Sequence, residues 1–141
     1  DIETIEADGR LKDEEKIQAN KELKQITEYR KEALISHKGR ILVIGLAVDD
    51  EEPIAISSDC EEDMIDKLGQ LLSNYSSAKF VGHNIKFDML FIFQKALKYG
   101  NRKVLEHICP SMKHNFIDTM DLAGHWMDYK YYISLDNLSK L

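Results

Sequence analysis

Cysteine is scarce in this chain, which has 141 residues. Its only two cysteines, Cys60 and Cys109, lie far apart in the sequence. Neither forms part of a cysteine pair of the kind that marks a disulfide framework or a zinc site. We therefore expect two idle thiols in a reducing cytosol.

Long apolar runs are also missing. No run approaches the roughly 18 residues that a membrane span needs, and no secretory signal is visible at the start of the chain. We therefore expect a cytoplasmic protein without a membrane partner.

An excess of basic residues is the third absence. The net charge of −6 argues against a basic protein that coats DNA. It still allows local binding of a few nucleotides, because metal ions can offset the carboxylates of such a site.

The length suits one domain with its own hydrophobic core.

Strand and helix patterns follow one another along the chain. Residues 12–34 are rich in Lys and Glu with apolar residues at helical spacing, which predicts a long amphipathic helix. The apolar run over 40–48 predicts a central strand, paired in a hairpin with 54–57. The other expected elements are strands at 1–5, 79–82 and 116–118, helices at 60–74, 84–99 and 119–127, a helical turn at 102–107, and a helix that begins near 134.

This order predicts one α/β domain over residues 1–141 with a mixed sheet flanked by helices. The charged helical segment at about 12–36 is expected to be an insertion in it.

Asp1 and Glu3 form the first acidic pattern. Alternate residues of a strand point to the same face, so these carboxylates would lie about 6.6 Å apart along it. They repel each other unless a cation lies between them, and two-metal phosphoryl-transfer sites use such carboxylates. Acidic alternation at an exposed strand edge is the structural alternative.

Asp88 is the more informative acid. Its predicted helix carries apolar residues nearly all round, so we expect that helix to be buried on most sides. An ionised carboxylate in such surroundings is costly without a partner. A metal ion would be a sufficient partner, and a buried Arg or Lys is the alternative.

The residues before this helix lie at a strand-to-helix junction, where ligand sites of α/β sheets gather. Gly82 permits close approach of the backbone. His83 is either part of such a site or a structural histidine. Asn84 is either a ligand contact or the N-cap of the helix.

Three segments together resemble a known family. His83-Asn84-Ile85-Lys86-Phe87-Asp88 looks like the second motif, H-N-x-x-F-D, of the DEDD (DnaQ-like) 3′-5′ exonucleases. Asp1-Ile2-Glu3-Thr4 looks like the first motif, and Asp118-Thr119-Met120-Asp121-Leu122 resembles a D-T-x-x-L segment that follows in many members. The sequences of these motifs most resemble those of the proofreading domains of family B DNA polymerases and of stand-alone predicted exonucleases related to them.

The resemblance implies a ribonuclease H-like fold and a site with two Mg²⁺ or Mn²⁺ ions. Asp1, Glu3 and Asp88 would be the catalytic metal ligands. Thr4, Asn84 and Phe87 would contact the 3′ end of a single-stranded DNA or RNA, with His83 and Asp118 as further candidates. A polymerase or another replication or repair protein is an implied partner.

The family also needs a fourth carboxylate from a third motif, Y-x-x-x-D or H-x-x-x-x-D. Tyr132 and Asp136 satisfy the first form and would share a helix face. The competing interpretation is that the stretch from Ser134 belongs to the helix before that motif. The domain would then be truncated at its end, and also at its start, where Asp1 lacks the apolar residues expected before it.

Two other functions stay open. One is a non-catalytic module of the same fold that binds single-stranded nucleic acid. The other is a different ribonuclease H-like nuclease that uses Asp136.

Overall fold

A computed structural model describes residues 14–75, 77–109, 115–124 and 133–140. The chain divides into two compact units, residues 1–40 and residues 41–141. None of the described helices is long and apolar enough to cross a membrane.

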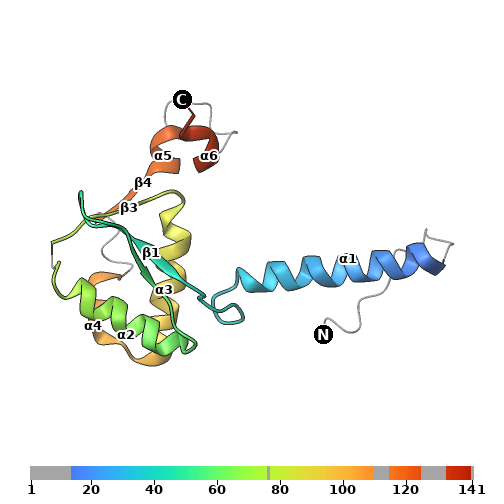
Figure 1. The fold of residues 1–141 in the computed structure, drawn as a ribbon, viewed down its shortest axis with the longest axis horizontal. Coiled ribbons are helices and arrows are strands. Elements are labelled where there is room, and N and C mark those ends of the chain that lie inside the picture. The colour runs from blue at the N-terminus through green and yellow to red at the C-terminus, as the bar shows by residue number, and fades with distance from the viewer. Residues whose placement is uncertain (1–13, 76, 110–114, 125–132, 141) are drawn as a thin grey trace. The chain divides into compact units, whose positions relative to one another are not determined.

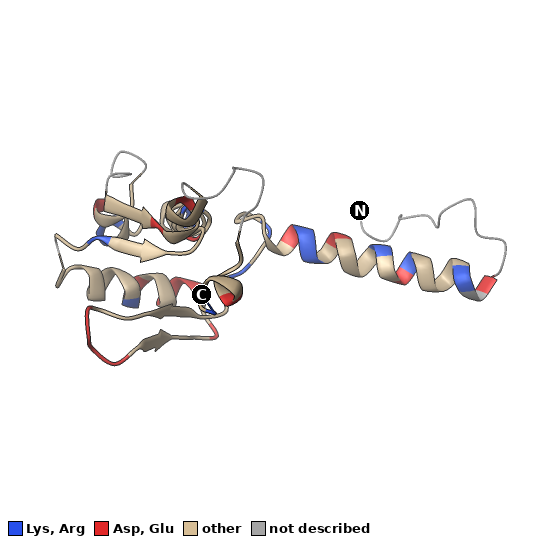
Figure 2. Cartoon of the chain, turned by 90° about the horizontal axis from the view of Figure 1, so that it is seen from above, with Lys and Arg blue, Asp and Glu red and all other residues tan. Residues whose placement is uncertain are grey.

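The first unit is built on the helix α1 (Glu14–Ala33), where the sequence predicted a helix over 12–34. Lys, Arg, Asp and Glu alternate along it (Figure 2). Within the unit, Lys31 pairs with Glu28 at 2.6 Å and Lys38 pairs with Glu32. Leu23 and Tyr29 are exposed to 63% and 71%, so much of this helix surface faces solvent within its own unit.

The second unit alternates short strands with helices in the predicted order (Figure 1). Its elements are β1 (Ile44–Leu46), β2 (Ile54–Ile56), α2 (Glu61–Leu72), β3 (Phe80–Gly82), α3 (Ile85–Tyr99), α4 (Arg102–His107), β4 (Phe116–Asp118), α5 (Thr119–Gly124) and α6 (Leu135–Leu138). The α/β class is confirmed. The expected strand at 1–5 and the end of the helix predicted over 119–127 lie outside the described residues.

The strands form two small sheets in the described part of the chain. β1 and β2 make an antiparallel hairpin in which Gly45 faces Ala55. β3 and β4 are parallel, with Gly82 opposite Asp118. One continuous mixed sheet is therefore not observed across the described residues, and the ribonuclease H-like sheet order stays a prediction.

The apolar run over 40–48 differs from its prediction as a buried central strand. Only three of its residues form β1, and β1 pairs with β2 alone among the described strands. Leu42 and Val43 are exposed to 76% and 57%. A continuous apolar run signals burial on both faces only where strands or helices cover both faces, and these two residues lack such cover.

The hydrophobic core lies between α2, α3, α4 and the β1–β2 hairpin. The inward stripe of α2 was predicted correctly, since Met64, Ile65, Leu68 and Leu72 are all buried. Ala96 of α3 and Val104 of α4 are fully buried against this stripe. One face of helix α3 is thereby packed against α2 and α4.

Helix α3 is less buried than its composition predicted. Only Ile85, Lys95 and Ala96 of this helix are buried, whereas Leu90 and Leu97 are exposed to 53% and 54%. The prediction of burial on most sides was wrong, because the described part of the unit covers one face of the helix and leaves the other open.

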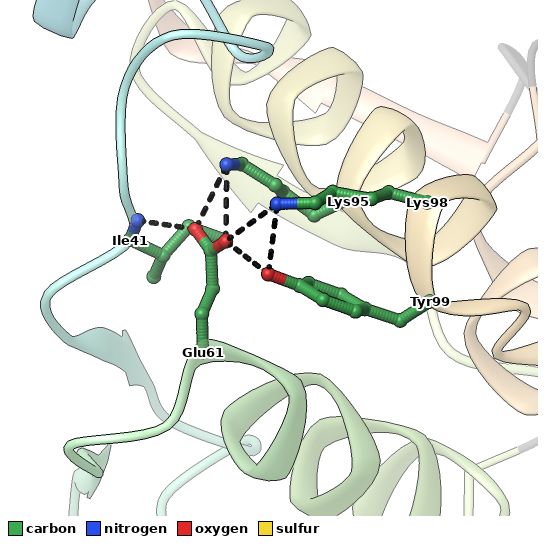
Figure 3. Close-up of polar contacts among 5 residues, drawn as sticks. All are labelled: Ile41, Glu61, Lys95, Lys98 and Tyr99. Atoms are coloured by element: carbon green, nitrogen blue, oxygen red, sulfur yellow. Dashed lines mark hydrogen bonds and ion pairs between the residues drawn. The ribbon is translucent and has the colours of Figure 1, made fainter.

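A buried ion cluster attaches the C-terminal end of α3 to α2 (Figure 3). The Lys95 Nζ atom lies 3.0 Å from the carboxylate of Glu61, and the Tyr99 hydroxyl donates to the same carboxylate at 2.6 Å. The backbone amide of Ile41 donates to Glu61 at 2.7 Å. One buried carboxylate thus joins the start of the unit, α2 and α3.

Candidate active site at the start of helix α3

The candidate site forms where two parallel strands end. β3 ends at Gly82 and β4 ends at Asp118, and these two residues face each other in the register of the pair. Helices α3 and α5 follow almost at once. Because the carboxyl ends of parallel strands meet at one edge of the sheet, residues 83–88 and 118–121 share that edge.

Gly82 is needed at this edge because the chain turns tightly. A Cβ atom at Gly82 would lie 3.1 Å from the side chain of Ile85, the first residue of α3. The missing side chain at Gly82 thus leaves room for Ile85, while close approach of a ligand to the Gly82 backbone stays a prediction.

Asn84 occupies the N-cap position of α3 in a left-handed conformation, with φ 58° and ψ 36°. The N-cap position predicted for Asn84 is confirmed, although its side chain makes no capping hydrogen bond. Instead, its backbone N–H donates to Oδ1 of Asp118 at 2.9 Å. The exposed side chain of Asn84 is available to a ligand.

Asp118 is a buried carboxylate, exposed to only 6%. Its Oδ1 accepts from the backbone N–H groups of Asn84 and Met120, at 2.9 and 3.0 Å. Its Oδ2 is buried and has no hydrogen-bond partner among the described residues. Buried polar atoms without a partner are rare and costly, so this oxygen marks the site as unusual.

Asp88 lies in the first turn of α3, and its side chain is exposed. The buried environment predicted for it was wrong, since the open face of α3 includes this residue. Even so, partial loss of hydration raises the pKa of Asp88, its own backbone N–H lowers it, and the charge of Asp118 raises it. A carboxylate such as Asp88, whose ionisation a neighbouring carboxylate opposes, attracts a cation.

His83 has partners at both ring nitrogens. Nδ1 lies 3.1 Å from the Thr119 hydroxyl, and Nε2 lies 2.8 Å from the carbonyl oxygen of Ile133. Since a carbonyl oxygen only accepts, Nε2 carries a proton and donates. Of the two alternatives for His83, this geometry favours a structural histidine that joins three segments of the site.

Phe87 presents an aromatic ring near these acids. It is exposed to 40%, and its ring centroid lies 6.0 Å from that of Phe91. A plain core position was the alternative for this residue, and its exposure argues against that alternative.

Comparison with known proteins adds the decisive observation. Residues 7–141 match a family described as 3′-5′ exonuclease. The chain belongs to this 3′-5′ exonuclease family. The predicted membership of the DEDD (DnaQ-like) superfamily is thereby confirmed. Neither the curated proteins nor the solved structures contain a match.

The match covers the edge described above and not the first acidic pattern. Residues 83–88 and 118–121 lie within it, whereas Asp1, Glu3 and Thr4 precede it and also lie outside the described residues. Membership indicates a nuclease that acts on nucleic acid. Closeness to the polymerase B proofreading domains stays a prediction.

The described part of this exonuclease supplies an incomplete set of metal ligands. It contains no group of three or more His, Cys, Asp or Glu side chains that could hold a metal ion. Asp136 lies on α6, exposed, in an ion pair of 2.6 Å with Lys140, and Tyr132 falls outside the described residues. Carboxylate oxygens suit Mg²⁺ and Mn²⁺, so Asp88 fits as one ligand of a larger set.

The role of Asp118 as a buried acceptor escaped the sequence interpretation, which took it only as a possible contact to nucleic acid. The local signal was present, because an Asp at the end of a strand commonly accepts from the N–H two residues later. The contact to Asn84 carries no such signal, since the two residues are 34 positions apart.

Proposed function

We propose that this exonuclease domain hydrolyses the 3′-terminal phosphodiester bond of a single-stranded nucleic acid and releases a nucleoside 5′-monophosphate. Asp1, Glu3 and Asp88 would hold two divalent ions, Mg²⁺ or Mn²⁺. The observation that carries this proposal is the position of Asp88, in a chain of this family. Asp88 is an exposed carboxylate with a raised pKa, beside the buried Asp118 where β3 and β4 end.

The metal ions would activate a water molecule and stabilise the charge that develops on the phosphate. Near Asp88 a cation would also offset the charge of Asp118 and favour the ionised carboxylate. The chain's own task at this point is to keep an exposed carboxylate at a fixed place, which the first turn of α3 does.

The substrate would be bound by neighbouring side chains. The Phe87 ring offers a stacking face that tolerates any base. The exposed amide of Asn84 offers a donor and an acceptor to sugar or phosphate oxygens. Thr4 is proposed as a further contact, and His83 would keep these segments together through Thr119 and Ile133.

The test is Asp88→Asn in the protein, with a 5′-labelled single-stranded oligonucleotide and Mg²⁺ or Mn²⁺. We expect shortening from the 3′ end to slow by on the order of 100-fold, since a charged contact worth roughly 3 kcal/mol is lost. Asp63→Asn is the matched control, because Asp63 is likewise an exposed carboxylate in the first turn of a helix, α2. Equal activity of the two variants would refute the ligand assignment.

The alternatives give different results in the same assay. A non-catalytic binding module would retain the oligonucleotide without shortening it and would show no heat with millimolar Mn²⁺. A nuclease that uses Asp136 would lose its activity in Asp136→Asn, whereas our proposal with Asp1, Glu3 and Asp88 predicts little change in that variant.

A further inference from the structure

We propose that Asp118 is a positioning residue for this site. Its carboxylate accepts a hydrogen bond from the Asn84 amide and so fixes where α3 begins. Asp88 and Phe87 lie in the first turn of that helix, and their places follow from its start. This inference rests on the proposed function, because it assumes that Asp88 binds a metal ion.

Asn84 has a left-handed backbone conformation at the N-cap of α3. A left-handed backbone costs most residues other than glycine roughly 1–2 kcal/mol and costs Asn less; Asn84 has φ 58°. Its side chain contributes no capping hydrogen bond that would offset this cost locally. The 2.9 Å bond from the Asn84 amide to Asp118 is charge-assisted and of sufficient strength to do so.

One oxygen atom of Asp118 accepts two backbone hydrogen bonds. Oδ1 of Asp118 accepts from Asn84 before α3 and from Met120 within α5. The same atom thereby ties the starts of both helices to the end of β4, while Gly82 and Asp118 are opposite each other in the strand register. A displacement of Asp118 would move the first turn of α3 together with Asp88.

The burial of Asp118 lowers the stability of the fold. A carboxylate exposed to only 6%, with Oδ2 unpartnered among the described residues, is a poor choice for stability alone. Its value lies in the acceptor that it provides to two backbone amides. An asparagine could supply that acceptor without the charge, whereas an alanine could not, and this difference makes the inference testable.

The experiment compares Asp118→Asn and Asp118→Ala in the protein by two measurements. Hydrogen exchange of the Asn84 and Met120 amides reports the hydrogen bonds, and titration with Mn²⁺ reports the site. We expect Asp118→Asn to keep amide protection and to bind Mn²⁺ within about threefold of the unmodified protein. Asp118→Ala should lose that protection and bind Mn²⁺ about 10–100-fold more weakly, as when outer supports of metal ligands are removed.

A rescue variant tests the conformational step. Glycine adopts positive φ without steric cost, so Asn84→Gly in the Asp118→Ala background should recover part of the Mn²⁺ affinity relative to Asp118→Ala alone. A merely structural loss of stability at position 118 would not be repaired in this way. No recovery would count against the proposed role of the Asn84 backbone.

Several outcomes would overturn the inference. Equal loss of Mn²⁺ affinity in both Asp118 variants, with amide protection kept in Asp118→Asn, would show that the charge acts and not the acceptor. Full protection of the Asn84 amide in Asp118→Ala would remove the geometric basis. If Asp118→Ala does not fold, loss of protection in folded Asp118→Asn decides against the inference. Absence of Mn²⁺ binding to the unmodified protein refutes the proposed function, while amide protection still tests the positioning contact.

Discussion

A carboxylate lies near each end of helix α3, Glu61 of α2 at one end and its own Asp88 at the other, and their surroundings are opposite. At its C-terminal end, Glu61 is buried and receives hydrogen bonds from Lys95, Tyr99 and the Ile41 amide. At its N-terminal end, Asp88 is exposed beside Asp118, which has an unpartnered oxygen among the described residues. The pKa of Glu61 is lowered, whereas the pKa of Asp88 is raised.

The contrast separates a stabilising arrangement from one that costs stability. Around Glu61 every contact favours the ionised carboxylate except burial itself. Around Asp88 partial loss of hydration and the charge of Asp118 oppose ionisation, and Asn84 adopts a left-handed conformation. Such local costs persist where surrounding structure enforces them, and they cluster at active sites.

The largest effect on stability is expected from Lys95→Met. Removing one member of a buried ion pair costs up to about 3–5 kcal/mol, and Tyr99, the Ile41 amide and Lys98 remain near Glu61 to reduce that loss. The side chains of Lys95 and Glu61 are exposed to only 4% and 7%. Denaturant unfolding would measure the loss, and a change below about 1 kcal/mol would mean that this cluster does not hold α3 to α2.

A pH-dependent loss of stability is the next expected effect. Burial alone would raise the pKa of Glu61, but the bonds from Tyr99 and Ile41, with Lys95, outweigh it and lower the pKa. A carboxyl group whose pKa is lower in the folded chain stabilises the fold above its ordinary pKa. That contribution is lost as the pH falls through the lowered value. Unfolding measured at several acidic pH values should therefore show a steeper decline for the unmodified protein than for Glu61→Gln, and parallel curves would contradict this.

A smaller effect of the opposite sign is expected from Asp88→Asn. A raised folded pKa means that the ionised group costs stability, and this cost appears as the pH rises from the ordinary value through the raised one. Asp88→Asn should thus increase stability at neutral pH, by less than about 1 kcal/mol because solvent screens an exposed group. A thermal unfolding scan beside Asp63→Asn would measure it. A clear loss of stability would show that Asp88 is a structural residue.

The smallest effect is expected from Lys98→Ala. Its Nζ atom lies 4.0 Å from the same Glu61 carboxylate, but its side chain is 59% exposed. Exposed ion pairs contribute little, so the unfolding midpoint should hardly move. Lys98 and Lys95 therefore form a matched pair on one helix, and similar losses in both variants would show that burial does not set the strength of the cluster.

Much of the fold could be predicted from sequence because its signals are local. The apolar spacing of α2 correctly predicted its buried stripe, and the strand-to-helix junction at Asn84 correctly predicted where α3 begins. Exposure could not be predicted in the same way. An apolar residue looks the same in the sequence whether or not another element covers it, and Leu42 and several apolar residues of α3 are exposed.

The polar contacts that define both ends of α3 were unpredictable for a related reason. Glu61 and Lys95 are 34 positions apart, as are Asn84 and Asp118. Neither pair leaves a periodic pattern in the sequence. Their meeting depends on how strands and helices pack, and only the structure shows it.

The long separation between Asn84 and Asp118 has a consequence for how the protein folds. Contacts between distant residues form only after the entropy of closing the intervening loop has been overcome. The backbone hydrogen bonds within α2 join residues that are close in sequence, whereas the candidate site needs β4 to pair with β3. Pulsed hydrogen exchange during refolding should therefore protect the Asn84 amide later than the amides of α2, so the candidate site would form after the helix that supports the core.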